Sequence, residues 1–423
     1  MKHLLLFLSC TLLAGTSWAD DSLLQKPDVK QALAWIESNH AANIEKQIQL
    51  SEIPSPTFAE TERAAALVKE FQRIGLKDIE ADARKNVMGW RPGKSPRAIV
   101  VSAHLDTVFP AGTDVHVKKE GKRLVGPGIG DDGRGLAAML AIAEAIQRAD
   151  IKTNHSILFV ANCCEEGLGD LLGVKYLLKE GKYKDRIDAF ISIDGTDTSR
   201  IVNRALASKR YKITVRGPGG HSWGNFGRVS PIHALGRIMD KFADTDVPAK
   251  PKTTFNIGKI GGGTSINAIA VEAWMEVDMR SESDTELEKL EQRLLAVARA
   301  GVDEEQKFRA KALQNKSKRS GDAKLTLEAK LLATRYGGET PVDSPLVQAA
   351  VWATKHFGQT PQLEIASTDA NVPINLHKQG VTLGGGGVGG DAHALEEWYE
   401  PEGAWRGAQQ VLLTVLSWDI RQK

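Results

Sequence analysis

Residues 98–106 read Ala98-Ile99-Val100-Val101-Ser102-Ala103-His104-Leu105-Asp106, a short apolar run that ends in two chemically active side chains. Several apolar residues in succession are typical of a strand buried inside a sheet. His104 and Asp106 follow where this strand ends, and residues two apart in a strand share a face, so the imidazole and the carboxylate can meet. Such a histidine can bind a metal ion, with the aspartate fixing its tautomer. The alternative is a buried, hydrogen-bonded histidine.

Strands and helices alternate on both sides of this run. Further strands are expected at residues 157–161 and 189–193, and helical spacing occurs at residues 29–49, 59–74, 136–146 and 171–178. This alternation predicts an α/β fold with a mixed, mostly parallel sheet sandwiched by helices. In such sheets ligands bind at the carboxyl ends of the strands, so a pocket is expected beside His104.

A second pattern begins near Ala207. Strand, helix, strand, strand, helix and strand are expected in that order at residues 211–215, 232–242, 255–260, 271–279, 284–300 and 325–329, which suits a small ferredoxin-like α+β domain. Helical spacing at residues 344–356 and 403–418 indicates that the first domain then resumes. We therefore predict a signal peptide at 1–19, a catalytic domain in two parts, 20–206 and 338–423, and an inserted domain at 207–337.

The N-terminus predicts export. A short basic start is followed by the apolar run 4–14 and by Ser17-Trp18-Ala19, which places small residues where a signal peptidase acts. Cleavage after Ala19 would leave Asp20 as the new terminus, and the mature protein is expected to be secreted or periplasmic. A lipoprotein modified at Cys10 is the alternative. Beyond this segment, no run of sequence approaches the ~20 apolar residues that a membrane helix needs.

Composition narrows the classes of partner. The 42% hydrophobic and 26% charged residues are typical of a globular chain, so disorder is not expected. A net charge of +2 argues for neither nucleic acid nor an anionic membrane as a partner. Cys163 and Cys164 are adjacent, and a ring between neighbouring cysteines is strained. This favours two buried thiols over a vicinal disulfide or a metal-binding role.

Carboxylates gather at the other expected strand ends. Asp131 lies in the segment 128–133, Glu165-Glu166 follows the strand at 157–161, and Asp194 ends the strand at 189–193. His393 comes later in the chain. Each signal is weak alone, since acids also cap helices, but their agreement at strand ends predicts a pocket. Three carboxylates and two imidazoles suit zinc, and Asp131, Glu166, Asp194 and a hydroxide would balance the charge of two Zn²⁺.

Two motifs point to other enzymes but lack the context those enzymes require. Gly128-Ile129-Gly130-Asp131-Asp132-Gly133 matches the dinucleotide fingerprint, yet its two carboxylates would repel a pyrophosphate. Gly220-His221-Ser222-Trp223-Gly224 fits the G-x-S-x-G of serine hydrolases, but that motif acts on a strand-to-helix turn of the main sheet. Ser222 is therefore the nucleophile of a weaker, alternative hypothesis.

Together these motifs resemble the dinuclear zinc exopeptidases that include peptidase T, glutamate carboxypeptidase, aminoacylase and succinyl-diaminopimelate desuccinylase. The resemblance covers essentially the mature chain, in order, through residues 53–56, 102–108, 128–133, 165–166, 192–195, 217–222, 267, 278–280, 367–371 and 393. It implies two bound Zn²⁺, or Co²⁺ or Mn²⁺ in their place. It also implies that the inserted domain is a lid through which two chains form a homodimer.

The resemblance assigns roles to the metal ligands. Asp131 would bridge the two ions, His104 and Asp194 would complete one site, and Glu166 and His393 would complete the other. Relatives can hold the bond between the paired aspartates in the cis form. Here those aspartates are followed by Gly133-Arg134, where many members have Lys-Gly, so the sequence leaves this bond open.

The resemblance also assigns catalytic and substrate-binding roles. Asp106 would orient the first histidine ligand, and Glu165 would be the general base that moves a proton from the attacking water to the leaving nitrogen. His221 would stabilise the oxyanion. Asn267 and Arg280 would grip the substrate, Arg280 through a bidentate contact to a carboxylate.

We therefore predict a secreted metallo-exopeptidase that hydrolyses amide bonds of short peptides. An N-acyl-amino-acid deacylase using the same site is the alternative within this chemistry. A catalytically silent binding protein is the alternative from another class, and the intact Glu165 and complete ligand set argue against it.

Overall fold

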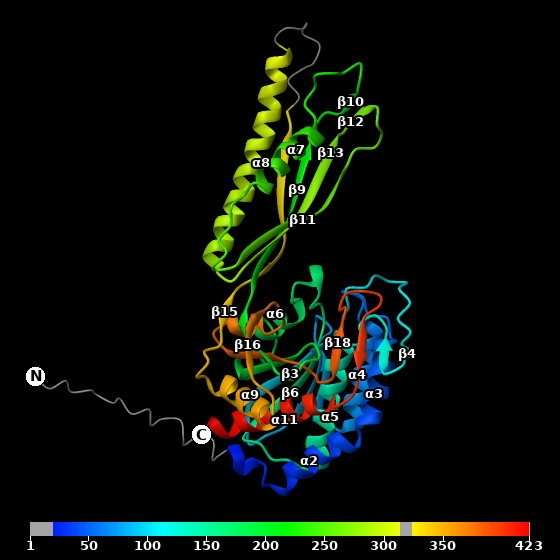
Figure 1. Ribbon diagram of the computed structural model, residues 1–423, viewed down its shortest axis with the longest axis vertical. Coiled ribbons are helices and arrows are strands. Elements are labelled where there is room, and N and C mark those ends of the chain that lie inside the picture. Colours follow the sequence, from blue (N-terminus) through cyan, green and yellow to red (C-terminus); the bar gives the residue numbers. More distant parts are fainter. Residues whose placement is uncertain (1–19, 314–323, 423) are drawn as a thin grey trace, which may run out of the picture. The chain divides into compact units, whose positions relative to one another are not determined.

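The computed structural model describes residues 20–313 and 324–422 (Figure 1). The predicted signal peptide, residues 1–19, lies outside the described residues. The chain forms two compact units, one ending at Arg204 and resuming at Glu339, the other comprising Ala205–Gly338. The boundaries drawn from the sequence, 207 and 337, fall within two residues of these positions.

The first unit is built on a nine-stranded sheet in the order β1-β2-β6-β3-β7-β17-β8-β15, with β16 paired to β8. Its four central strands, β6, β3, β7 and β17, run parallel, whereas β1, β2 and β8 pair antiparallel. The sheet is therefore mixed and parallel at its centre, as predicted. Its strands are β1 (Lys77–Ala81), β2 (Val87–Arg91), β3 (Ser95–His104), β6 (His155–Asn162), β7 (Ile187–Ile193), β8 (Arg200–Ala205), β15 (Gly338–Glu339), β16 (Gln362–Ala366) and β17 (Gln379–Leu383).

Helices cover both faces of this sheet. Alternate residues of β3 face opposite cores: Ile99 and Val101 belong to one buried cluster, and Ala98 and Val100 to another. The larger cluster takes side chains from α2 (Pro27–Ser38), α3 (His40–Ser51), α4 (Thr61–Ile74), α5 (Gly133–Arg148), α9 (Pro345–His356) and α11 (Trp405–Arg421), and the smaller from α6 (Leu172–Lys179) and α10 (Asn371–Asn375). The sheet is thus buried on both faces, which leaves its carboxyl edge for a site.

The first long helical pattern is two helices rather than one. Residues 29–49 predicted a single helix, but α2 ends at Ser38 and α3 starts at His40. At the break, the Asn39 side-chain amide donates to the Trp35 carbonyl at 2.9 Å. Asparagine side chains compete with the backbone for such hydrogen bonds, and this favours a helix end.

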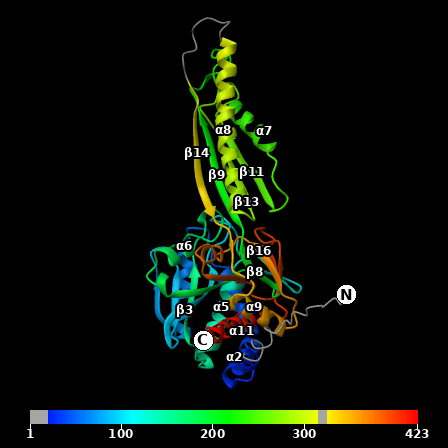
Figure 2. The ribbon, with the colours of Figure 1, turned by 90° about the vertical axis from the view of Figure 1, so that its left-hand side faces the viewer.

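The second unit has the predicted ferredoxin-like topology. Its antiparallel sheet has the order β11-β13-β9-β14, and helices α7 and α8 follow β9 and β13 (Figure 2). The core of this unit also takes side chains from both helices. The elements are β9 (Ala207–Arg216), α7 (Pro231–Ala243), β11 (Thr253–Gly262), β13 (Glu272–Ser281), α8 (Asp284–Leu313) and β14 (Thr326–Arg335). A two-residue pairing of β10 (Gly220–His221) with β12 (Ala268–Ile269) completes it.

Helix α8 is longer than the sequence predicted. The expected helix ended at residue 300, before Gly301, whereas α8 continues to Leu313. A Cβ on Gly301 would lie 2.5 Å from Ile238 Cγ1 of α7. This glycine therefore permits close helix packing and does not end the helix, because packing outweighs its low helix propensity. Within the described ranges, no helix combines the length and apolar character needed to cross a membrane.

Candidate metal centre

The predicted metal ligands of the first unit lie where adjacent parallel strands end. His104 is the last residue of β3, Glu165-Glu166 follow β6 after a two-residue turn, and Asp194 follows β7 directly. Because β6, β3 and β7 are neighbours in one parallel register, these side chains meet at the carboxyl edge of the sheet.

Asp131 lies between two imidazoles. Its Oδ1 lies 2.9 Å from His104 Nε2, and its Oδ2 lies 3.1 Å from His393 Nε2. The same His393 nitrogen lies 3.0 Å from Glu166 Oε1. Ligand atoms of His104, Asp131 and Glu166 all fall within 4.8 Å of one another. The structure thus brings together four of the five predicted ligands, with one oxygen of Asp131 facing each histidine.

Asp194, the fifth predicted ligand, faces the same group of charges. Burial and the neighbouring Asp131 carboxylate raise the pKa of Asp194 to about 6. Its backbone amide donates to the Leu383 carbonyl of β17 at 3.0 Å, which fixes the chain at this point. The Asp194 carboxylate thus belongs electrostatically to the same cluster as Asp131, as a ligand of a shared metal centre would.

The two acids at the start of α5 have separate roles. Asp132 caps the helix by accepting the Gly135 amide at 3.0 Å, and its other oxygen accepts the His104 amide at 3.0 Å. Asp131 instead faces the two imidazoles, and the peptide bond between the two aspartates is cis. The sequence left capping and cation binding open for this pair. The structure assigns capping to Asp132 and leaves Asp131 facing the imidazoles.

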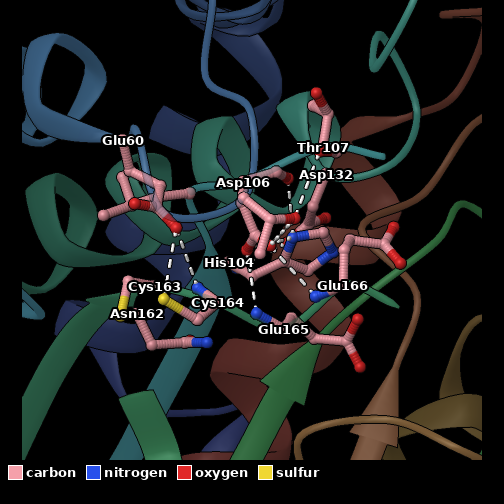
Figure 3. Close-up of polar contacts among 12 residues, drawn as sticks. Glu60, His104, Asp106, Thr107, Asp132, Asn162, Cys163, Cys164, Glu165 and Glu166 are labelled. Carbon is pink, nitrogen blue, oxygen red and sulfur yellow. Dashed lines mark hydrogen bonds and ion pairs between the residues drawn. The ribbon is translucent and has the colours of Figure 1, made fainter. Parts of the chain in front are cut away.

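Asp106 has more partners than its predicted role required. The His104 ring nitrogen Nδ1 lies 3.0 Å from the Asp106 backbone carbonyl and 3.6 Å from its carboxylate. The carboxylate instead accepts the amides of Glu165 at 2.9 Å and Glu166 at 3.0 Å (Figure 3). It also accepts the Thr57 hydroxyl at 2.9 Å. The carbonyl therefore orients the imidazole, while the carboxylate positions the two glutamates.

The electrostatics of the cluster favour a bound cation. Burial by itself opposes ionisation of Asp131, but hydrogen bonds from the two histidines hold its pKa well below the usual value. Hydrogen bonds to Asp131 and Glu166 raise the pKa of His393 to about 10. Burial also raises the pKa of Glu166. Clustered carboxylates that depend on positive partners fit a divalent ion, and these nitrogen and oxygen donors suit zinc.

The adjacent cysteines are free, buried thiols. Ligand atoms of Cys163, Cys164 and Glu60 lie within 4.8 Å of one another. However, Glu60 Oε1 already accepts the Phe58 amide at 3.0 Å. It also accepts the Cys164 amide at 3.1 Å and faces Cys164 Sγ at 3.4 Å (Figure 3). These bonds brace the turn that leads from β6 to Glu165, which accounts for the group without a metal ion.

Four buried polar residues around the site had no role predicted from the sequence. Arg63 donates to the carbonyls of Ser51, Ile53 and Leu105, and Arg134 donates to those of Gly385 and Ala404. Asp369 accepts the Asn162 side-chain amide at 2.7 Å, and burial raises its pKa well above the usual value. Glu397 accepts three backbone amides of the Asp131 loop. Only their sequence proximity to motif residues could have drawn attention to them.

The three remaining predicted residues belong to the second unit. His221 Nδ1 accepts the amides of Trp223 at 3.2 Å and Gly224 at 3.1 Å, so Nε2 is the nitrogen that carries a proton. Asn267 accepts the Ser222 amide through its backbone carbonyl at 2.9 Å. Arg280 Nε donates to Asp278 Oδ2 at 2.8 Å. The structure thus places His221 and Asn267 on paired segments, and it pairs Arg280 with an aspartate.

Comparisons with known proteins agree on one family. The model of peptidase family M20/M25/M40 matches residues 100–417. An uncharacterised protein of Bacillus subtilis, YqjE, is 25% identical over 61% of this chain and 71% of its own. A solved tripeptidase of Staphylococcus aureus superposes with a TM-score of 0.72 at 22% identity, covering 90% of this chain and 99% of that one. A solved Bacillus subtilis protein, described as a dinuclear metal-binding peptidase of the M20 family, gives 0.64 at 15% identity, covering 90% and 98%. These two structures have the same fold as this chain.

The contacts of Asp106 generate a prediction. In the variant Asp106→Asn, a side-chain N–H would face the backbone N–H of Glu165 or Glu166. Two donors cannot form a hydrogen bond, so the two adjacent glutamates would be displaced. We expect turnover or metal affinity to fall about 10- to 100-fold, measured by peptide hydrolysis and metal content. Thr57→Val is the matched control, because it removes one hydrogen bond from the same carboxylate and should have a smaller effect. Wild-type turnover and metal content in Asp106→Asn would contradict the positioning role.

Proposed function

Because this chain belongs to peptidase family M20/M25/M40 and is a metal-dependent hydrolase of peptide bonds, we propose that it is an exopeptidase acting on short peptides. Two divalent metal ions would be held at the carboxyl edge of the sheet. One would be bound by His104 and Asp194, the other by Glu166 and His393, with Asp131 shared between them. Zinc is the proposed metal, and Co²⁺ or Mn²⁺ could replace it in the same donor set.

The placement of Asp131 carries this proposal. A carboxylate that faces one imidazole through each oxygen, at 2.9 and 3.1 Å, is arranged as a bridge between two ligand sets. A single-metal site would need only one of these contacts. The description of the Bacillus subtilis structure as a dinuclear metal-binding peptidase supports the same arrangement here.

Glu165 is the proposed general base. Two bound metal ions would polarise the scissile carbonyl and lower the pKa of the attacking water. The Glu165 carboxylate would take a proton from the attacking water and give it to the leaving nitrogen. This residue is 5% exposed, and its backbone amide donates to Asp106, so its position is fixed by the same carboxylate that fixes Glu166. Glu166 can thus bind a metal ion while its neighbour Glu165 transfers the proton.

Substrate contacts are proposed for the second unit. His221 would stabilise the oxyanion through its protonated Nε2, because its Nδ1 is occupied by two backbone amides. Asn267 and Arg280 would bind the substrate, and Arg280 would exchange its contact with Asp278 for a substrate carboxylate. We favour short peptides as the substrates because the similar Staphylococcus aureus structure is a tripeptidase.

The variant Glu165→Ala tests the mechanism. We expect it to retain about two metal equivalents, because the ligands remain, while peptide turnover falls at least 100-fold, the lower range for a general base. Metal content by mass spectrometry and hydrolysis of dipeptides, tripeptides and N-acetyl-amino acids are measured with and without a chelator. Glu120→Ala, at an exposed position of β4 (Lys118–Glu120), is the control.

Different outcomes separate the candidate functions. Hydrolysis of peptides that is lost on chelation supports the exopeptidase, whereas preference for N-acetyl-amino acids supports the deacylase alternative. Metal binding without turnover on either class would indicate a silent binding protein. Turnover that survives both chelation and Glu165→Ala would contradict the mechanism and direct attention to Ser222.

We propose that the protein is a homodimer joined through the second unit. Three large apolar side chains of this unit are highly exposed: Trp223 at 88%, Phe226 at 75% and Ile266 at 104%. Exposed apolar side chains that gather on one surface favour contact with another protein. Strand β11 also ends the four-stranded sheet, and an edge strand can pair with another chain.

Light scattering of the purified protein should give twice the mass of one chain. Replacing Trp223 and Phe226 with serine should shift the protein toward the monomer, because both apolar side chains would be removed from the proposed contact. Leu168→Ser, which changes a residue 56% exposed in the first unit, should leave the mass unchanged. A wild type with the mass of one chain at micromolar concentration would contradict the dimer.

We propose that the protein is exported and cleaved after Ala19. In support, Asp20 is fully buried, and its Oδ1 accepts the Ser417 hydroxyl of α11 at 2.7 Å. A second contact joins the same carboxylate to Arg421. The chain is therefore anchored from the first residue that would remain after cleavage.

N-terminal sequencing of the protein recovered from a periplasmic or secreted fraction should begin at Asp20. Ala19→Arg should block processing, because signal peptidases require a small residue at that position. A lipid-modified terminus at Cys10 in the mass spectrum would support the lipoprotein alternative instead. An unprocessed chain in the cytoplasm would contradict export.

A further inference from the structure

One buried glutamate anchors the loop that carries the proposed bridging aspartate. Glu397 Oε1 accepts the amides of Gly130 at 2.7 Å and Asp131 at 2.9 Å, while Oε2 accepts the Gly128 amide at 2.9 Å. Its backbone carbonyl accepts a fourth amide, that of Gly126, at 2.8 Å. The residue is 2% exposed, so water cannot readily replace these bonds. The loop therefore depends on Glu397 for its conformation.

The same residue closes the loop that carries His393. This loop joins β18 (Val388–Gly390) to β19 (Trp398–Glu400), which are paired antiparallel. Within it, the Glu397 amide donates to the Ala394 carbonyl at 3.1 Å. The Trp398 indole donates to Asp391 Oδ2 at 3.0 Å. Glu397 is thus fixed relative to His393 by four residues of tightly turned chain.

Glu397 consequently joins two ligand-bearing segments that lie far apart in the sequence. Asp131 and His393 are 262 positions apart, and their side chains meet at 3.1 Å. A second carboxylate close to Asp131 is electrostatically unfavourable, since the two negative charges repel each other. Hydrogen bonds from three backbone amides of the loop offset this repulsion. The carboxylate is therefore held in place by the loop that it positions.

We infer that Glu397 is a positioning residue that holds Asp131 and His393 in register for the second metal ion. This inference rests on the two-metal function proposed above. On the His393 side, His393 and the shared Asp131 lie on segments that Glu397 joins, and Glu166 does not. On the His104 side only the shared Asp131 does, because His104 and Asp194 come from the ends of β3 and β7. Loss of Glu397 should therefore weaken one ion more than the other.

The variant Glu397→Gln tests the inference. It keeps the size of the side chain, but its amide group would oppose the loop's N–H donors. We expect one ion to bind as in wild type, and the other to bind about 10- to 100-fold more weakly, with kcat falling in parallel. Isothermal titration with Zn²⁺ and the absorption spectrum of the Co²⁺-loaded protein measure the two sites. Glu396→Gln, at the exposed neighbouring position, is the matched control and should behave as wild type.

A second variant perturbs the same contact without removing the charge. A Cβ at Gly130 would lie 3.1 Å from Glu397 Oε1, so Gly130→Ala should displace the carboxylate by a few tenths of an ångström. We expect a smaller loss of affinity at the same site. Glu397 remains in this variant, so a weaker metal affinity would reflect a displaced carboxylate and not a general loss of stability. Thermal unfolding followed by circular dichroism would record any such loss of stability.

Two results would overturn the inference: Glu397→Gln binding both ions with wild-type affinity, or both ions being lost equally while Gly130→Ala is unaffected. A wild type that binds fewer than two ions would instead overturn the two-metal function, and the inference with it. The metal titration of the wild type thus separates the two failures.

Discussion

The hydrogen bonds of the Asp106 carboxylate are the contacts on which the metal centre depends, because they join the ends of two adjacent strands. This carboxylate accepts the amides of both Glu165 and Glu166 and faces His104. A buried carboxylate is stable only when its oxygens are paired, so it and the two amides hold one another in place. The geometry of the sheet is thereby transmitted to a proposed metal ligand and to the proposed general base. No flexible loop lies between the ends of these strands and the two glutamates.

Two buried arginines extend the same principle to the surrounding loops. Arg63 donates to three backbone carbonyls, among them that of Leu105, and Arg134 holds the glycine-rich segment through Gly385. Buried guanidinium groups require such acceptors, since an unpaired cation away from water is costly. A loop whose carbonyls satisfy a buried arginine is consequently fixed, although it has no regular secondary structure. The segments beside His104 and beside α5 are both held in this way.

Several parts of the structure could be predicted because they depend on local patterns. Apolar runs predicted three of the four central strands, β3, β6 and β7, and acids after those runs predicted the carboxyl-edge cluster. The structure departs from the predictions at two helices. Gly301 lies inside α8 because it makes room for Ile238, a tertiary contact that no window of sequence shows. The first helical pattern breaks at Asn39 because its side chain binds the Trp35 carbonyl, a local contact that competed with the helical pattern.

By itself, the sequence determined the alternating α/β pattern of the first unit, the inserted ferredoxin-like unit and the side chains able to bind a metal ion, because these follow from residue type and periodicity. The tertiary structure decided which of two adjacent acids faces the imidazoles: Asp131 does so, whereas Asp132 caps α5. It also decided the role of Glu397, whose side-chain partners lie 266 to 269 positions away in the chain. Hydrogen bonds between segments so distant depend on how the sheet brings them together, and no local pattern encodes that encounter.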